Sequence, residues 1–360
     1  MFLKGREATA SSFPLSFVNG GDGSDGRIVW FDVARGISVI LVVLFHASIA
    51  ANQAGIMPRY VWLINDLVAP IRMPLFFAIS GILGNTTINK SWKELLSKRI
   101  ILLWYLYVLW STIGYFSSIT DFEKFRLAQW YGLIIRPNTV LWFIWALGIF
   151  FAVAKFSPKP ARGAVLLLSI TIAVFTSTNM LKVEYSPYLK SIRYMPFFLF
   201  GIWFNRCIIK MLEHYWITLI VSGLSFNILF FTMRWSGELK VLDILLSSSG
   251  MLLGLSGSIV LERVRVLSRI FRIFGRNTLT IYLSHSLFLV FLVSMVAKTG
   301  LASTVAGQSC GLFLVSGGAI ALAFVLRRVS EGVGAYWLYA LPRFVVAHLS
   351  KNIMISESAN

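Results

Sequence analysis

The chain has 360 residues and a mean hydropathy of +0.75; 57% of its residues are hydrophobic and only 13% are charged. These values exclude a long disordered chain, a secreted disulfide scaffold and a soluble nucleic-acid module, and they indicate an integral membrane protein. The net charge of +18 would suggest a nucleic-acid partner if the chain were soluble. In a membrane protein, basic residues gather in the cytoplasmic loops, so the excess reports orientation and no nucleic-acid partner is expected.

The first 27 residues are rich in glycine and serine and hold no apolar run long enough to cross a membrane. They also lack the order of a signal peptide, in which a charged stub is followed at once by a short apolar stretch and a small-residue cleavage site. We therefore predict that residues 1–27 form a flexible cytoplasmic tail.

Ten apolar runs follow this tail. Crossing the hydrocarbon core of a bilayer takes about 20 mostly apolar residues. The runs therefore predict an all-α, polytopic membrane protein with about ten transmembrane helices, which form one domain over residues 28–330. Pro196 in the sixth run predicts a kinked or broken helix. The runs lie near residues 30–51, 67–84, 100–119, 140–156, 164–179, 194–209, 216–233, 241–260, 278–297 and 312–329.

The charges of the connecting segments indicate how these helices are oriented. If the N-terminus is cytoplasmic, the inner segments hold 22 of the 33 Lys and Arg residues. This bias favours two cytoplasmic termini, although the basic segments 121–136 and 182–193 oppose it. Residues 331–360 are expected to form a cytoplasmic or interfacial tail, in which the aromatic stretch 336–343 lies along the membrane surface.

Three ionisable residues share one face of the first predicted helix. Arg35 and His46 are eleven residues apart, which is close to three whole turns, and Asp32 precedes Arg35 by three residues. His46 therefore stands about 16 Å further along the helix axis than Arg35. A guanidinium grips phosphate or carboxylate groups, and an imidazole exchanges a proton near neutral pH. The stripe would suit group transfer from an anionic donor held at the inner membrane surface.

Plainer interpretations exist for the same residues. Arg35 alone is better explained as an interfacial anchor, and His46 could hydrogen-bond a neighbouring helix. Ionisable groups are costly inside a membrane, however, and three on one face favour a functional site.

Further polar residues occur in later helices. Ser80 and Gly81 are small, and their more probable role is to let helices pack closely. The basic segment 90–100 at the start of the third helix could bind acidic lipid headgroups, which charge alone favours, or the phosphates of a nucleotide donor. Tyr282 and His285 lie three residues apart on one helix face and could contact either a substrate or another helix.

Several familiar motifs are missing from the sequence. It contains no His-Glu-x-x-His, no phosphate-binding Gly-x-x-x-x-Gly-Lys-Ser/Thr loop and no cysteine-pair metal signature. Metal-dependent hydrolysis and nucleotide-triphosphate motors are therefore not expected, and no metal site is predicted.

Four short motifs together resemble the acyltransferase 3 family of polytopic membrane acyltransferases, which includes O-acetylases of bacterial surface polysaccharides and nodulation factors. Each motif is weak alone, but their order and spacing from about residue 27 to 330 carry the resemblance. The motifs are Phe-Asp-Val-Ala-Arg-Gly-Ile at 31–37 with His46 at the family's Arg-x10-His spacing, Pro-Leu-Phe-Phe-Ala-Ile-Ser-Gly at 74–81, Leu-Trp-Phe at 141–143, and Gly-Arg-Asn-Thr-Leu-Thr-Ile-Tyr-Leu-Ser-His at 275–285.

The resemblance implies ten helices, a cytoplasmic acyl-CoA donor and transfer of the acyl group to an acceptor hydroxyl, usually on a sugar. It implies that His46 is the essential catalytic residue and that Arg35 is its motif partner. Many members carry an Arg-x-x-Arg element at the start of the third helix; here Arg99 is followed three residues later by Leu102, and Lys98 could supply part of the missing charge. Other matched motif residues are expected to support the site, namely Asp32, Ser80, Trp142, Tyr282 and His285.

The sequence therefore predicts a bacterial inner-membrane O-acyltransferase that moves an acetyl group from cytoplasmic acetyl-CoA to a cell-surface glycan. Acetyl-CoA would be a co-substrate, and no permanently bound cofactor is expected. Membrane lipids, a sugar or lipid-linked glycan and polysaccharide-assembly proteins are the expected partners. The alternative is a transporter or glycan flippase whose translocation path contains Arg35 and His46, because proton-coupled carriers also place such groups in their helices.

Overall fold

The structure is a computed structural model that describes residues 29–118, 126–137, 140–236, 239–342 and Val345. The predicted tail at residues 1–27 lies outside the described residues, as does nearly all of the chain after Pro342. In the described part the regular elements are helices, without any β-strand, which confirms the all-α fold class. The α-helices are α1 (Val29–Gln53), α2 (Tyr60–Ile88), α3 (Trp92–Leu95), α4 (Ile101–Ser118), α5 (Leu127–Ile135), α6 (Trp142–Phe156), α7 (Arg162–Ser177), α8 (Ser186–Trp203), α9 (Asn205–Glu213), α10 (Tyr215–Ser236), α11 (Asp243–Glu262), α12 (Arg265–Arg276), α13 (Thr278–Ala297) and α14 (Val305–Gly332).

Short helical segments of other types join some of these helices. A π-helical segment, Leu96–Ile100, connects α3 to α4. The remaining segments are 3₁₀ turns at Lys159–Ala161, Lys240–Leu242, Gly300–Ser303 and Tyr336–Leu338.

The helices agree with the ten apolar runs of the sequence. Within the described ranges, seven helices are long and apolar enough to cross a membrane, and the bent pair of α8 and α9 adds an eighth if it counts as one span. The two remaining runs form shorter apolar helices, Ile101–Ser117 and Trp142–Phe156. The chain is thus a polytopic, all-helical membrane protein, as the sequence predicted.

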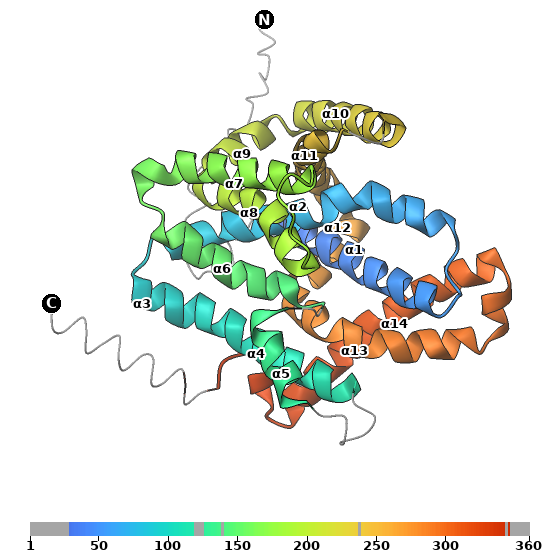
Figure 1. Cartoon of the computed structure of the whole chain (residues 1–360). Helices are drawn as coiled ribbons and strands as arrows, with labels where there is room; N and C mark the ends of the chain where they lie inside the picture. Colours follow the sequence, from blue (N-terminus) through green and yellow to red (C-terminus); the bar gives the residue numbers. More distant parts are fainter. Residues whose placement is uncertain (1–28, 119–125, 138–139, 237–238, 343–344, 346–360) are drawn as a thin grey trace, which may run out of the picture.

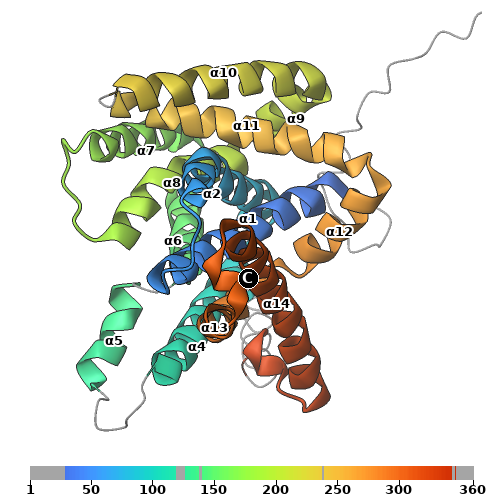
Figure 2. The ribbon, with the colours of Figure 1, turned by 90° about the vertical axis from the view of Figure 1, so that its right-hand side faces the viewer.

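α1 and α2 run through the middle of the helix assembly. In Figures 1 and 2, α10 and α11 lie on one side of these two helices, and α4, α5, α13 and α14 lie on the other. The largest cluster of buried apolar side chains includes residues from α1, α2, α4, α6, α8, α11 and α13. The motif residues 31–37, 74–81, 141–143 and 278–285 therefore meet in the interior, although they come from separate parts of the chain.

Glycines let α2 and α8 approach very closely. A Cβ added at Gly81 would overlap the backbone oxygen of Phe198, and one at Gly201 would overlap the backbone oxygen of Ala78. The packing role expected for Gly81 is confirmed, because only hydrogen leaves room for the partner backbone at this contact.

The bend expected at Pro196 lies elsewhere. α8 continues through Pro196, which is buried, and ends at Trp203; α9 then departs at 78°. Phe204 leaves the helical conformation with φ −116° and ψ 27°, and the Asn205 side chain accepts a hydrogen bond from the Arg206 amide at 2.8 Å. The new helix thus begins at an asparagine, a residue type that favours helix starts over helix interiors, and its N-cap position is Phe204.

The basic segment 263–276, which connects the eighth and ninth apolar runs, contains the amphipathic helix α12. Ser268 and Gly275 are buried in the contact with α1, whereas Val266, Ile270 and Ile273 are exposed apolar residues. A short helix with an exposed apolar face and several arginines is typical of an element that lies in the membrane surface. Figure 2 shows α12 at the edge of the assembly, beside the first half of α1.

The aromatic stretch after α14 packs against α4. Trp110 Nε1 donates a hydrogen bond to the Leu338 carbonyl at 2.7 Å, and the Tyr105 hydroxyl donates one to the Trp337 carbonyl at 2.9 Å. Tyr339 is buried, and its ring centroid lies 5.4 Å from that of Trp110. The described beginning of the predicted C-terminal tail is therefore part of the packed structure.

Candidate active site

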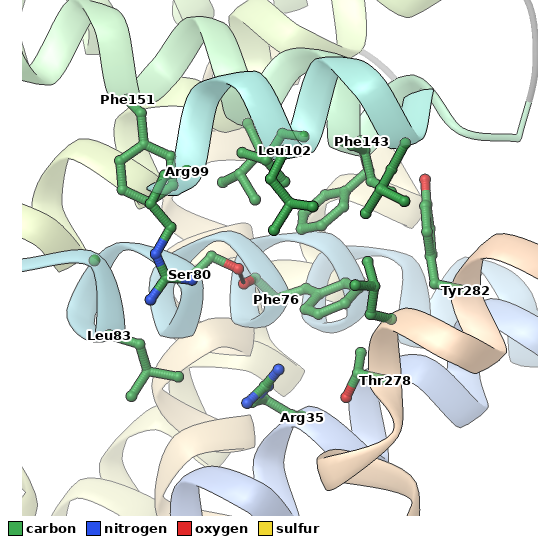
Figure 3. A pocket seen from close by; sticks show the side chains of 16 residues that line it. Arg35, Phe76, Ser80, Leu83, Arg99, Leu102, Phe143, Phe151, Thr278 and Tyr282 are labelled. Carbon is green, nitrogen blue, oxygen red and sulfur yellow. Dashed lines mark hydrogen bonds between the residues drawn. The ribbon is translucent and has the colours of Figure 1, made fainter. Parts of the chain in front are cut away.

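A cavity of about 420 Å³ lies between α1, α2, α4, α6 and α13 (Figure 3). Its wall is mostly leucine, isoleucine and phenylalanine. The polar side chains on the wall are those of Arg35, Ser80, Arg99, Thr278 and Tyr282. The cavity is thus a mainly apolar chamber with two cations, which suits a ligand that has an apolar body and an anionic end.

The two arginines come from different helices. Arg35 lies in the first half of α1, and Arg99 belongs to the π-helical segment before α4. Figure 3 shows both guanidinium groups near Ser80, whose hydroxyl donates to the Phe76 carbonyl at 2.8 Å. π-helical turns are often found at functional sites because they change the direction of a side chain within a helix. The cavity therefore contains two cations, Arg35 from α1 and Arg99 from this π-helical turn.

Asp32 joins α1 to the end of α12. Its side chain is only 4% exposed, and its Oδ2 lies 3.4 Å from Arg276 Nε. Its other oxygen, Oδ1, lies 4.0 Å from Arg35 Nη1. α12 comes this close to α1 because Gly275 has no side chain: a Cβ there would overlap the Asp32 carbonyl oxygen. Asp32 is absent from the cavity wall and orients the arginine that forms part of it.

Aromatic rings form the other end of the cavity. The rings of Phe76 and Phe143 stack with centroids 4.4 Å apart, and the Tyr282 centroid lies 5.5 Å from that of Phe143. The Tyr282 hydroxyl donates a hydrogen bond to the Val140 carbonyl at 2.6 Å, which holds the ring in place. In Figure 3, Tyr282 lies at the opposite end of the labelled group from Arg99.

A pair of histidines lies one helical turn beyond Tyr282. His285 Nε2 is 3.2 Å from His46 Nδ1, so the pair connects α13 to α1. His285 is completely buried and His46 is partly buried. His46, which the helical period places on the same face of α1 as Arg35, thus points toward α13.

The hydrogen bonds of His285 assign the protons of both rings. Its Nδ1 lies 2.9 Å from the Tyr282 carbonyl oxygen and 3.0 Å from that of Ile281. Carbonyl oxygens only accept hydrogen bonds, so this nitrogen carries the proton, and Nε2 of the neutral ring has a lone pair. Nε2 then accepts the Nδ1 proton of His46. In this arrangement Nε2 of His46 is the unprotonated nitrogen, which is the form that a general base requires.

The cavity does not reach the histidines directly. Neither His46 nor His285 is part of its wall, whereas Tyr282 is, and the ring centroids of Tyr282 and His285 are 6.1 Å apart. Tyr282 is thus a residue of the cavity wall that lies next to His285.

The structure brings most of the predicted site residues together. Arg35, Arg99, Ser80 and Tyr282 line the cavity, whereas Asp32, His46, Trp142 and His285 are not part of its wall. Trp142 is buried outside the cavity, with its ring centroid 5.9 Å from that of Phe77. The side chain of Lys98 is outside what the structure describes.

Sequence reasoning missed two arginines near this site. Arg276, the partner of Asp32, belongs to the fourth motif but was given no role; α12 ends at Arg276, and α13 begins at Thr278. Arg72 lies in the second apolar run and is only 6% exposed. A cation within an apolar run is by itself a functional signal, and this rule would have selected Arg72.

Comparison with known proteins identifies the family to which the chain belongs. A sequence profile described as an acyltransferase domain, that of the acyltransferase 3 family, matches residues 28–328. The chain belongs to the acyltransferase 3 family. It is also 24% identical over 219 residues to the inner membrane protein YcfT of Escherichia coli (strain K12), and this match covers 51% of the chain and 58% of that relative. No solved structure is significantly similar to the chain.

Membership in the acyltransferase 3 family confirms the resemblance found in the sequence. The family match extends from the start of α1 to Arg328 near the end of α14, so it includes the cavity and both histidines. The donor, the acceptor and the roles of single residues are not part of this assignment.

Proposed function

We propose that the protein transfers an acetyl group from acetyl-CoA to a sugar hydroxyl of a cell-surface glycan, with His46 as the general base. The observation that carries the proposal is the order of groups from the cavity to the histidines: two arginines, one on α1 and one before α4, an apolar chamber, and then a histidine pair on α1 and α13 with a defined proton arrangement. This order matches the donor molecule, which has phosphates, a long pantetheine arm and a terminal thioester.

The phosphates of CoA would bind at the arginine end. Arg35 and Arg99 present guanidinium groups, which form strong charge-assisted hydrogen bonds with phosphate oxygens. The pantetheine arm then lies along the leucine and phenylalanine side chains, and the thioester reaches the aromatic end at Tyr282. With the donor in the cytoplasm, the Arg35 end of α1 faces the cytoplasm, in agreement with the charge bias of the sequence.

The reaction needs one proton acceptor. Nε2 of His46 takes the proton of the acceptor hydroxyl while the oxygen of that hydroxyl attacks the thioester carbonyl carbon. The carbon–sulfur bond then breaks, the acyl group stays on the acceptor as an ester, and the histidine returns the proton to the departing thiolate of CoA. His285 holds the His46 ring in the required tautomer throughout, because its own Nδ1 proton remains bonded to backbone carbonyls.

General-base catalysis contributes about 10²–10⁴-fold, and the positioning of the two substrates adds more. The Tyr282 ring shields the histidine pair from the chamber until the thioester displaces it, which limits hydrolysis of the donor by water. Lys98 belongs to the same π-helical segment as Arg99. In this proposal it adds positive charge where the phosphates of the donor bind.

The location proposed for this activity is the bacterial inner membrane, with both chain termini in the cytoplasm and with polysaccharide-assembly proteins as partners. Purified full-length protein in lipid vesicles, supplied with labelled acetyl-CoA and a glycan fraction from the producing cells, tests the proposal. We expect labelled ester on the glycan without any membrane gradient. Gradient-dependent solute movement without an acylated product would instead identify a carrier.

A further inference from the structure

Arg72 is a buried cation whose role the proposed reaction does not explain. It lies in α2 with 6% of its surface exposed, and its Nη1 atom is buried without a hydrogen-bond partner among the described residues. The described carboxylates form no ion pair with it. Its guanidinium carbon lies 3.9 Å from the centroid of the Phe45 ring, on the ring face. A cation–π contact of this kind offsets only part of the free energy that desolvation of a guanidinium costs.

Arg72 is close to the histidine pair. Phe45, on which it stacks, directly precedes His46, and the centroids of these two rings are 5.4 Å apart. Arg72 and Lys190 of α8 also lie within electrostatic range of His46 and of each other. Lys190 is exposed, and its Nζ atom lies 5.9 Å from the centroid of the Trp142 ring. Two cations from different helices thus lie near the proposed catalytic base.

The CoA phosphates are not the partner of Arg72. In the proposed binding mode they lie at Arg35, and Phe45 is ten residues further along α1, which corresponds to about 15 Å. Arg72 is also absent from the wall of the donor cavity. The Arg72 guanidinium, whose Nη1 atom lacks a hydrogen-bond partner, is therefore not assigned to the nucleotide part of the donor.

The negative oxygen of the acyl-transfer intermediate fits less well than a separate anionic group. Oxyanion donors lie about 3 Å from the reacting oxygen, which itself must be close to the base. The guanidinium instead stacks on the ring of Phe45, next to His46. The inference assigns the guanidinium to an anionic group of the acceptor, and contact with the atom under attack is the alternative that the kinetics below distinguish.

We propose that Arg72, together with Lys190, binds a carboxylate or phosphate group of the acyl acceptor, which would make the acceptor an anionic glycan. A guanidinium binds either group through two parallel hydrogen bonds, and the bound anion would supply the charge partner that Arg72 lacks in the fold. This inference rests on the proposed function, and it predicts a class of acceptor that the family assignment leaves open.

The test begins with the natural product. Glycans from cells with and without the protein are compared by mass spectrometry, and the unit that gains the acyl group is expected to contain a carboxylate or a phosphate. A neutral acylated unit would overturn the inference and leave the proposed function intact. The absence of any acylated glycan would count against the proposed function itself.

Kinetics then test Arg72 directly. The acceptor fraction is used untreated, after carbodiimide and borohydride reduction of its carboxylates, or after removal of its phosphates, and these treatments identify which anion is bound. With untreated acceptor, we expect Arg72→Gln to raise the acceptor KM about tenfold to hundredfold, which is the loss expected for hydrogen bonds to a charged group. The acceptor KM of Arg72→Lys should lie between those of the wild type and Arg72→Gln, because lysine retains the charge without the planar fork of arginine. The KM for acetyl-CoA should stay unchanged.

Removal of the anion is the decisive control. For acceptor that lacks its anionic group, wild type and Arg72→Gln should have equal KM values. An equal loss of kcat on both forms of acceptor would show that Arg72 acts on the reacting atoms and would overturn the inference. Arg72→Met should unfold at the same temperature as wild type or higher, since an unpaired buried charge destabilises a fold. A clear decrease would mean that Arg72 has a structural partner, and this would also contradict the inference.

Discussion

Nδ1 of His46 and Nε2 of His285 lie 3.2 Å apart, although 239 residues separate the two histidines in the chain. The contact connects the first helix of the family domain to its ninth apolar run. It also sets the chemistry of the pair, because the backbone carbonyls that bind His285 determine which nitrogen of His46 remains unprotonated. The two histidines therefore act as one unit.

Replacement of His46 tests the proposed base. We expect His46→Ala to insert and fold like the wild type but to lose about 10²–10⁴-fold in kcat, because a general base contributes this much. The measurement is transfer of labelled acetyl to the glycan fraction in vesicles. His214, an exposed histidine between α9 and α10, provides the matched control, and His214→Ala should keep full activity. Equal activity in both variants would remove His46 from the mechanism.

Replacement of His285 tests the proton arrangement. Loss of a buried hydrogen-bond partner costs about 1–3 kcal/mol, which corresponds to a decrease in kcat of about fivefold to a hundredfold. We expect this decrease in His285→Leu. His285→Gln should restore part of the rate, since its side-chain oxygen can accept the Nδ1 proton of His46. If the two variants were equally impaired while both remained folded, packing would explain the role of His285 and tautomer control would not.

Arg99 is expected to recognise the nucleotide part of the donor. Arg99→Gln should raise the KM for acetyl-CoA by about tenfold to hundredfold, as hydrogen bonds to charged groups contribute about 1.5–3 kcal/mol. Lys93→Gln, a change at an exposed lysine of the same basic segment, should have little effect. Acetyl-pantetheine lacks the nucleotide phosphates, so wild type and Arg99→Gln should use it equally well. A defect of Arg99→Gln that persists with acetyl-pantetheine would contradict phosphate binding.

Much of the fold could be predicted because membrane helices leave a strong one-dimensional signal. Each apolar run became a helix, and the helical period placed Arg35 and His46 on one face of α1. The partners of these residues could not be derived in this way. That His285 faces His46 and that Tyr282 forms part of the cavity wall depend on how α13 packs on α1, and a repeat pattern along one helix does not contain this information.

The ninth apolar run was predicted to begin at residue 278, where α13 begins, but the helix α12 before it was not predicted. Arg276 and Asn277 precede this run, and Asn277 leaves the helical conformation with φ −107° and ψ 19° between α12 and α13. The charged, amphipathic α12 can lie in the membrane surface, where its arginines stay hydrated, whereas α13 is apolar and enters the bundle. The chain thus changes direction between α12 and α13 because charged side chains favour the membrane surface and apolar ones favour the bundle. This change in direction places Arg276 beside Asp32.

The contact between α12 and α1 leads to a prediction about stability. Alanine in place of glycine ordinarily stabilises a helix interior by about 0.5–1 kcal/mol. At Gly275, however, the added methyl group would overlap the Asp32 carbonyl oxygen of α1, and a forced shift of this kind costs about 1–3 kcal/mol. We therefore expect Gly275→Ala to unfold at a lower temperature in detergent than the wild type.

The control variant is Gly257→Ala, at a position of α11 where a Cβ meets nothing within 4 Å, and it should unfold at the same temperature as the wild type or at a higher one. Because Gly275 lets Arg276 reach the carboxylate that orients Arg35, Gly275→Ala should also raise the KM for acetyl-CoA, whereas Gly257→Ala should not. Equal unfolding temperatures and equal KM values in the two variants would mean that α12 can move away from α1 without cost, and the position of Arg35 would then need another explanation.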